Sequence, residues 1–128
     1  MVRTLLSAGY LPVVSSIGID EAGELLNVNA DDAAAGIAGA IGARRLVLLT
    51  DVSGIKGADG AVRSRLTSAE VEAMIASGEI TGGMIVKARS AVSASRSTGA
   101  AVVIVSGESP EPLMRLLAGE TVGTTVTA

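Results

Sequence analysis

Two short aliphatic runs constrain the fold of this chain more than any other feature. Arg45–Thr50 reads RLVLLT and Ala101–Ser106 reads AVVIVS. Near-continuous apolar runs of this length are typical of strands that are buried on both faces of a parallel sheet. We therefore expect both segments to be central strands of one sheet that helices cover.

Helix start and stop signals surround these two runs. Asn29 can cap a helix that Gly42 ends, Thr67 to Glu70 (TSAE) is a capping box, and Ser109-Pro110 predicts an N-cap followed by proline at N1. The predicted helices cover residues 29–42, 67–76, 84–98 and 110–118. This alternation predicts an α/β fold, a three-layer αβα sandwich with a mostly parallel central sheet.

The two ends of the chain carry weaker patterns. Met1–Ala8 is typical of the tail of a helix, and a helix this close to the first residue suggests a chain cut from something longer. Val13–Ile19 and Leu25–Val28 predict two short strands, joined by a turn, that form a small β-hairpin. The alternation in Thr124–Thr127 predicts a last edge strand. At 128 residues we expect a single domain.

Composition excludes several kinds of chemistry. The chain has no Cys and no His, which removes thiolate nucleophiles, disulfides, the usual zinc sites and imidazole catalysis. It has one Tyr and no Phe or Trp, so the core must consist of Ala, Val, Ile, Leu and Met. Gln is also absent and Arg outnumbers Lys, a bias typical of a high-GC genome or of a simplified, designed sequence.

Charge and hydropathy argue against nucleic-acid and membrane partners. The net charge is −3, without a basic cluster, and Tyr10 alone cannot form a stacking platform for bases. No apolar run approaches 18 residues, and the N-terminus lacks a signal-peptide pattern. We therefore expect a cytoplasmic protein.

A glycine pair followed by a lysine marks the first candidate site. Thr81–Lys87 (TGGMIVK) opens a predicted helix and contains one of only two lysines in the chain. Lys87 opposes the positive end of the helix dipole, but an ammonium that converges with backbone N–H groups on one point suits a bound phosphate. The alternative is a flexible linker with a solvated lysine, and the heptapeptide alone leaves both open.

Polar residues also gather where the second predicted hairpin strand gives way to a helix. Asn27–Asp31 reads NVNAD. In the structural interpretation, these residues are a helix cap with acids matched to the dipole. In the functional one, Asn27 contacts a ligand carboxylate or amine and Asp31 orients a cation. Both can hold, because caps and ligand sites use the same exposed helix end.

A long glycine-rich loop follows the first central strand. It runs from Asp51 to Gly60 and begins with DVSGI. Loops at the carboxyl ends of parallel strands are where open α/β sheets bind ligands. The loop is neither a Walker A loop nor a GxGxxG fingerprint. It is either a plain strand exit with Asx-type turns, or a nucleotide-binding loop in which Asp51 accepts from a sugar or ring donor and Val52 and Ile55 touch the base.

Taken together and in this order, these segments resemble the amino-acid kinase family, and within it the C-terminal, ATP-binding half of the acetylglutamate kinases. The resemblance covers all but the first residues of the chain. The motifs that carry it are GYLPVVSSIGI (Gly9–Ile19), NVNADDAA (Asn27–Ala34), LLTDVSGI (Leu48–Ile55), TGGMIVK (Thr81–Lys87) and GTTV (Gly123–Val126).

The resemblance implies ATP-dependent phosphorylation of the γ-carboxylate of N-acetyl-L-glutamate, a step of arginine biosynthesis, with ATP and Mg²⁺ as substrate and no tightly bound cofactor. It implies that Asn27 contacts the acetylamino acid, that Asp31 organises the catalytic lysines, and that Lys87 stabilises charge on the transferring phosphoryl group. The residues implied to bind the nucleotide are Thr50, Asp51, Val52, Ser53, Gly54, Ile55, Lys56, Ile80, Thr81, Gly83, Met84 and Lys87. Such chemistry is mostly positioning and charge neutralisation, which needs neither His nor Cys.

The resemblance also implies what these residues lack. The family's N-terminal half carries a lysine paired with Lys87 across the phosphoryl group, Gly-rich phosphate loops, much of the acylamino-acid pocket and the main dimer contact. Two smaller departures are Gly82, where acidic or polar residues are common in relatives, and Lys56, which lies in a variable part of the loop. Neither residue is expected to prevent nucleotide binding.

Three hypotheses follow. The chain is an ATP- or ADP-binding domain that is inactive, or nearly so, as a kinase alone. It is half of a split kinase that works when a partner supplies the other half. Or it is an engineered or reconstructed scaffold without activity. In each case we expect exposed apolar surface near residues 10–30 and self-association through it.

Overall fold

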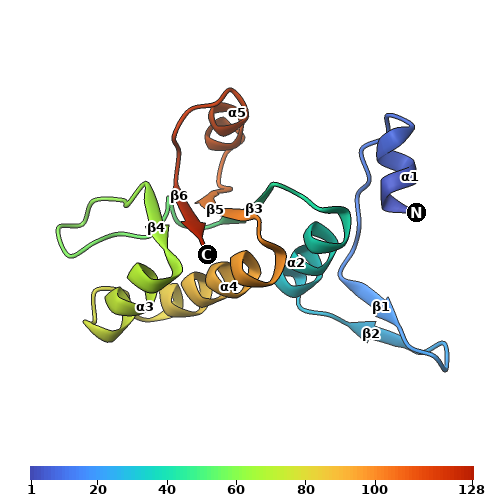
Figure 1. The fold of residues 1–128 in the computed structure, drawn as a ribbon, viewed down its shortest axis with the longest axis horizontal. Coiled ribbons are helices and arrows are strands. Elements are labelled where there is room, and N and C mark those ends of the chain that lie inside the picture. Colours follow the sequence, from blue (N-terminus) through green and yellow to red (C-terminus); the bar gives the residue numbers. More distant parts are fainter.

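The computed structural model of the protein describes all 128 residues (Figure 1). Its helices are α1 (Val2–Ser7), α2 (Ala30–Ile41), α3 (Ser68–Ala76), α4 (Gly83–Thr98) and α5 (Glu111–Leu117). Its strands are β1 (Ile17–Ile19), β2 (Leu25–Asn27), β3 (Arg45–Thr50), β4 (Arg65–Thr67), β5 (Ala101–Ser106) and β6 (Thr124–Thr127).

Four strands form the central sheet, in the order β3-β5-β6-β4. β3 pairs with β5, and β4 with β6, in parallel, whereas β5 and β6 are antiparallel. α2, α3 and α4 lie on one side of the sheet and α5 on the other (Figure 1). The predicted α/β sandwich is confirmed, and β1 and β2 form the small antiparallel hairpin predicted near the N-terminus.

The core lies between β5 and α4. Val102–Val105 of β5 are all buried, with Val126 of β6 among them. α4 contributes Ala88, Ala91 and Ala94 to the same core. Because these side chains are small, the helix approaches the sheet closely, and dense packing replaces the aromatic side chains that the sequence lacks.

β6 is an interior strand, so the prediction of an edge strand at Thr124–Thr127 is wrong. Its alternation suggested one solvated face, but Thr124 is fully buried and its hydroxyl accepts a hydrogen bond from the backbone N–H of Ile55 at 2.8 Å. A buried threonine with a satisfied hydroxyl cannot be distinguished from an exposed one by pattern. The edge position belongs to β4, a three-residue strand that the sequence analysis did not predict.

The opposite edge of the sheet is β3, which was predicted to be central. Of its residues only Leu48 is buried, and Leu49 is 54% exposed. The expectation of burial on both faces therefore holds for β5 but is wrong for β3. Composition identifies a strand, but its position in the sheet depends on which neighbours pair with it.

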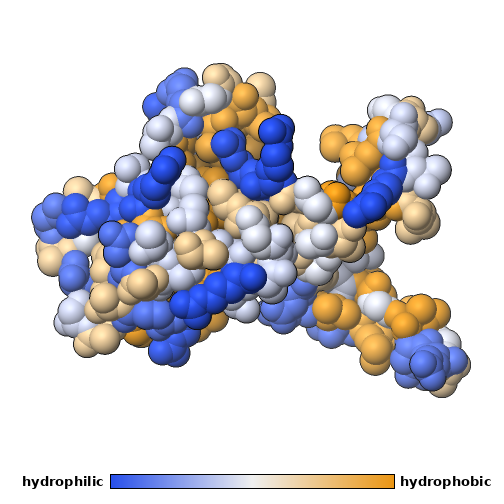
Figure 2. Space-filling model, viewed as in Figure 1, coloured by the Kyte–Doolittle hydropathy of each residue, from blue (hydrophilic) through white to orange (hydrophobic).

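The segment before α2, residues 1–29, extends away from the central sheet (Figure 1). The strand predicted at Val13–Ile19 is shorter, because only Ile17–Ile19 find a partner, in Leu25–Asn27. Residues 10–16 belong to no strand, although the Ser16 carbonyl accepts from the N–H of Val28, and Leu11 and Val13 are almost fully exposed. Apolar side chains are visible over α1 and the hairpin in Figure 2, as predicted for residues 10–30. Self-association through this surface stays a prediction.

The helix ends follow the predicted chemistry with one exception. The Asn29 side chain accepts from the backbone N–H groups of Asp31 and Asp32, and Gly42 ends α2 with a left-handed conformation. α5 begins one residue later than predicted, with Pro110 at the N-cap and no capping side chain. Local signals therefore fix most helix ends to within a residue.

The predicted capping box of α3 is complete. The backbone N–H of Glu70 donates to Thr67 Oγ1, and the Glu70 carboxylate accepts from the backbone N–H of Thr67 at 2.7 Å. These bonds to the Thr67 backbone and hydroxyl lower the pKa of Glu70. The box therefore stabilises the fold above the usual titration range of a glutamate, and this contribution is lost as the pH falls through the lowered pKa.

We expect Thr67→Ala to lower Tm at neutral pH by about 3–5 °C, because the substitution removes an N-cap. Thermal unfolding followed by circular dichroism measures this. The difference from the unmodified chain should narrow as the pH drops below about 4. Thr121→Ala, at an exposed loop threonine, is the control and should leave Tm unchanged. An equal effect of both substitutions would contradict a contribution from the box.

Candidate functional site

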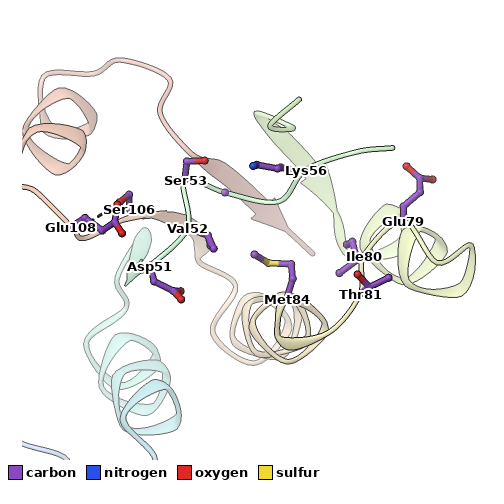
Figure 3. Close-up of a pocket in the computed structure, with 11 residues that line it drawn as sticks. Asp51, Val52, Ser53, Lys56, Glu79, Ile80, Thr81, Met84, Ser106 and Glu108 are labelled. Carbon is purple, nitrogen blue, oxygen red and sulfur yellow. Dashed lines mark hydrogen bonds between the residues drawn. The ribbon is translucent and has the colours of Figure 1, made fainter. Parts of the chain in front are cut away.

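The main cavity lies at the carboxyl end of β3. It opens between the loop that follows β3 (the β3 loop, residues 51–63) and the turn that joins α3 to α4 (Figure 3). Its volume is about 480 Å³, within the range of roughly 300–1,000 Å³ that small-molecule sites occupy. Three segments line it: residues 51–56, residues 79–84 and residues 106–108.

The β3 loop is anchored at its base and folded back on itself. Ile55 is fully buried, and its backbone N–H bonds to Thr124 of β6. Lys56 forms an isolated antiparallel bridge with Val62, and an ion pair joins Asp59 to Arg63 at 3.2 Å. The loop is therefore a narrow hairpin that forms one wall of the cavity.

The opposite wall comes from the end of α3 and the start of α4. Ile80 is buried in the core, and Thr81 and Met84 face the cavity in Figure 3. Val52 lies across from Met84. Both apolar side chains line the cavity and pack against the core, and polar side chains lie around them, so this part of the site can hold a flat apolar ring.

Lys87 lies in the second turn of α4 and pairs with Asp51. Its ammonium donates to the Asp51 carboxylate, and this hydrogen bond is the main cause that lowers the pKa of Asp51. The Asp51 side chain is 76% exposed and that of Lys87 34%, so solvent screens the pair. A polyanion that approaches this end of the cavity can therefore draw Lys87 from Asp51 at small cost.

Most of the residues implied to bind a nucleotide surround this cavity. They are Asp51, Val52, Ser53, Gly54, Lys56, Ile80, Thr81 and Met84. Thr50 ends β3 just before them, and Gly83 begins α4. Ile55 lies in the core, so its side chain does not reach the cavity. The roles of all these residues in nucleotide binding stay predictions.

Asn27 and Asp31 lie elsewhere. Asn27 is exposed at the end of β2, in the hairpin that extends from the sheet. Asp31 lies in the first turn of α2 and lines a smaller cavity of about 180 Å³ together with Ser90 and Ser93 of α4. Neither residue lines the main cavity. The motifs that the sequence analysis singled out therefore do not all lie at one site in these 128 residues.

Three residues that line the cavity were missed by the sequence analysis: Glu79, Ser106 and Glu108. Ser106 and Glu108 follow β5, which is adjacent and parallel to β3, so the rule on strand carboxyl ends could have found them. Glu79 carried no signal, because a single glutamate after a helix-ending glycine looks like a solvated turn residue.

Two further features of the chain bear on its chemistry. No three side chains among Asp, Glu, His and Cys are grouped as metal ligands. None of the helices has both the length and the apolar character needed to span a bilayer.

The α/β fold and the cavity at the carboxyl end of β3 are features that known protein families can be compared with. The Amino acid kinase family matches residues 1–106, and the chain belongs to this family. Within it, the chain is similar to acetylglutamate kinases. It is 46% identical to that of Vibrio vulnificus (strain CMCP6) over 124 residues, which are 97% of this chain and 47% of the relative. It is 49% identical to that of Pectobacterium atrosepticum over 128 residues, which are 49% of the relative.

The chain thus spans about half the length of the curated relatives it matches. Solved structures show where the same fold occurs in larger proteins. N-acetylglutamate synthase from Neisseria gonorrhoeae, complexed with coenzyme A and N-acetyl-glutamate, has a TM-score of 0.87 and 26% identity, over 99% of this chain and 30% of that protein. Carbamate kinase from Giardia lamblia bound to AMP-PNP has a TM-score of 0.70 at 20% identity, over 98% of this chain and 47% of the other, and shares the fold.

Proposed function

We propose that these 128 residues are the ATP- and ADP-binding half of an acetylglutamate kinase-like phosphotransferase of arginine biosynthesis, acting in the cytoplasm. The observation that carries the proposal is the main cavity, which is lined by the DVSGI loop and by the residues that open α4. Those two motifs also carry the resemblance to the acetylglutamate kinases. Mg²⁺ would arrive with the nucleotide as part of the substrate.

The chemistry of the cavity suggests how the nucleotide binds. The base lies between Val52 and the pair Ile80 and Met84, where the walls are apolar. The phosphates lie towards Lys87, which leaves Asp51 and pairs with them. Asp51, once released, is free to accept a hydrogen bond from the sugar. This orientation exchanges one screened ion pair for a stronger contact with a polyanion.

In the complete enzyme, a carboxylate oxygen of N-acetyl-L-glutamate attacks the γ-phosphorus and ADP leaves. Lys87 neutralises charge on the transferring group, Asp31 organises the lysines and Asn27 contacts the acetylamino acid. Asn27 and Asp31 lie apart from the main cavity in these residues, so we expect almost no phosphoryl transfer without the other half of the family's structure. Transition-state charge contacts are each worth several powers of ten in rate in related chemistry.

Two alternatives keep the same fold. In the first, the chain is half of a split kinase, and adding the other half in trans restores ADP release that depends on acetylglutamate. In the second, it is an engineered or reconstructed scaffold, whose cooperative unfolding transition is not moved by nucleotide. A single titration separates the binding hypotheses from the scaffold.

We expect Mg²⁺–ADP to bind with a Kd below 1 mM, about the level of a functional nucleotide site. NMR shifts should be confined to residues that line the main cavity, and binding at a hundredfold excess over Kd should stabilise the fold by about 2.7 kcal/mol. Met84→Glu should abolish binding by placing a carboxylate beside the base. Met114→Glu, at an exposed methionine of α5, is the matched control and should bind normally. Unmoved NMR signals at several millimolar nucleotide would reject the proposal.

A further inference from the structure

The tip of the β3 loop, residues 57–61, is joined to the body of the protein by one hydrogen bond. The backbone N–H of Ala58 donates to Glu79 Oε2 at 3.2 Å. The other backbone hydrogen bonds of the tip are internal, from Gly57 to Ala61 and from Gly60 to Gly57. The Asp59 carboxylate likewise bonds only within the loop, to Ala61 and Arg63. The orientation of the tip therefore depends on Glu79.

The backbone of Glu79 is held by the end of α3. Gly78 has a positive φ of 78°, and the N–H of Glu79 donates to the Met74 carbonyl at 3.0 Å, which is the geometry of a Schellman motif at the end of α3. The second carboxylate oxygen of Glu79 lies 3.1 Å from Ser77 Oγ, whose single hydroxyl proton is shared between this oxygen and the Met74 carbonyl. The next residue, Ile80, is buried in the core. The backbone of Glu79 is thus fixed independently of the loop tip, and its carboxylate lies beside Ser77.

The two segments that this hydrogen bond joins form opposite walls of the main cavity. The loop contributes Ser53, Gly54 and Lys56 to one wall, and Glu79 and Ile80 belong to the other (Figure 3). A bond between the walls at their outer end sets how far they stand apart. The Glu79 carboxylate accepts from Ala58 of the loop and also lines the cavity, so its removal changes the position of the loop as well as the lining.

We infer that Glu79 is a positioning residue that holds the tip of the β3 loop against the α3–α4 turn and so sets the width of the slot for the nucleotide base. The inference rests on the proposed function and adds to it a residue that no motif of the chain indicated. Glu79→Ala frees the tip, and a bound nucleotide must then restrict the loop at its own entropic cost.

The test combines a measurement on the free protein with one on the nucleotide complex. In the free protein, amide hydrogen exchange of Ala58 should be about tenfold faster in Glu79→Ala than in the unmodified chain, because the only partner of this N–H is lost. Mg²⁺–ADP should bind the same variant about five- to tenfold more weakly. Glu79→Gln keeps an oxygen acceptor and should restore most of both properties.

Glu72→Ala is the control, because Glu72 is on α3 and its carboxylate makes no hydrogen bond. It should change neither exchange at Ala58 nor affinity, and all variants should keep nearly the same Tm. Unchanged exchange in Glu79→Ala would overturn the tether, and faster exchange with unchanged affinity would overturn its role in the base slot. Failure of the unmodified chain to bind Mg²⁺–ADP would instead overturn the proposed function, and the role of Glu79 in binding with it.

Discussion

Replacing Lys87 with methionine is expected to lower the rate of phosphoryl transfer about a thousandfold in an enzyme that contains these residues. Lys87 is one of two lysines in the chain, and its ammonium is in contact with Asp51, which lines the main cavity. Methionine keeps the length and the apolar stem of the side chain but removes the charge. The loss should therefore fall on the transition state, where charge on the transferring group is greatest.

The experiment requires a complete active site. A suitable enzyme is a chimera in which this chain replaces the matching half of the Vibrio vulnificus acetylglutamate kinase, to which it is 46% identical. Steady-state ADP release, dependent on N-acetyl-L-glutamate, gives kcat and KM. In Lys87→Met we expect kcat to fall about a thousandfold and KM for ATP to change by less than about tenfold, as for an interaction made mainly in the transition state.

Lys56 provides the matched control, because it lines the same cavity from the β3 loop. Lys56→Met removes an equal charge from the cavity lining but outside the Asp51–Lys87 pair, so kcat should fall by less than about tenfold. Lys87→Arg should recover part of the lost rate, since it restores the charge with a different geometry. Equal losses in Lys56→Met and Lys87→Met would show a general dependence on cavity charge and would exclude a specific role of Lys87.

The parts of the fold that could be predicted from sequence are those determined within a few residues. Asn29 at the start of α2 and the capping box of Thr67 and Glu70 identify helix starts, because the partners lie within three residues of each other. The run AVVIVS likewise identifies β5, which is buried along most of its length. These features depend on local chemistry alone.

The parts that were predicted wrongly depend on distant neighbours. Thr124–Thr127 became an interior strand because it pairs with β5 on one side and β4 on the other, and its Thr124 hydroxyl meets Ile55 across the sheet. Val13 belongs to no strand, because strand propensity forms a strand only where a partner exists. The composition of a segment does not show which strands, if any, will pair with it.

The residues of the candidate site also fall into those that local sequence could predict and those that it could not. The contiguous segments 51–56 and 80–84 were predicted, since each lies in a motif that can be recognised as a unit. Glu79 was not, because its contribution is a hydrogen bond to Ala58, 21 residues away. Asn27 and Asp31 were recognised by their motif, but their position relative to the main cavity could not be derived from sequence order. A motif therefore indicates which side chains can take part in a reaction more reliably than it indicates which of them lie close together in the fold.

Gly123→Ala is expected to be the most destabilising single-methyl substitution in the chain. Gly123 begins the GTTV motif and has a positive φ of 71°, which costs any other residue about 1–2 kcal/mol. An added Cβ would also lie 2.1 Å from the carbonyl oxygen of Ile104 and 3.2 Å from the Cα of Val105. Both are backbone atoms of the central strand, so neither can rotate away, and β6 would have to separate from β5.

We expect Gly123→Ala to lower the free energy of unfolding by at least about 3 kcal/mol, a large part of the 5–15 kcal/mol typical of a small domain. Urea unfolding measures this directly. Gly119→Ala is the matched control, because Gly119 also has a positive φ, 94°, but an added Cβ there meets no atom within 4 Å. It should cost only the backbone term of about 1–2 kcal/mol. If both substitutions cost the same, the close approach to Ile104 is not what requires glycine. If Gly123→Ala costs more, the GTTV motif serves strand packing in this chain, whereas DVSGI and TGGMIVK each contribute residues to the lining of the main cavity.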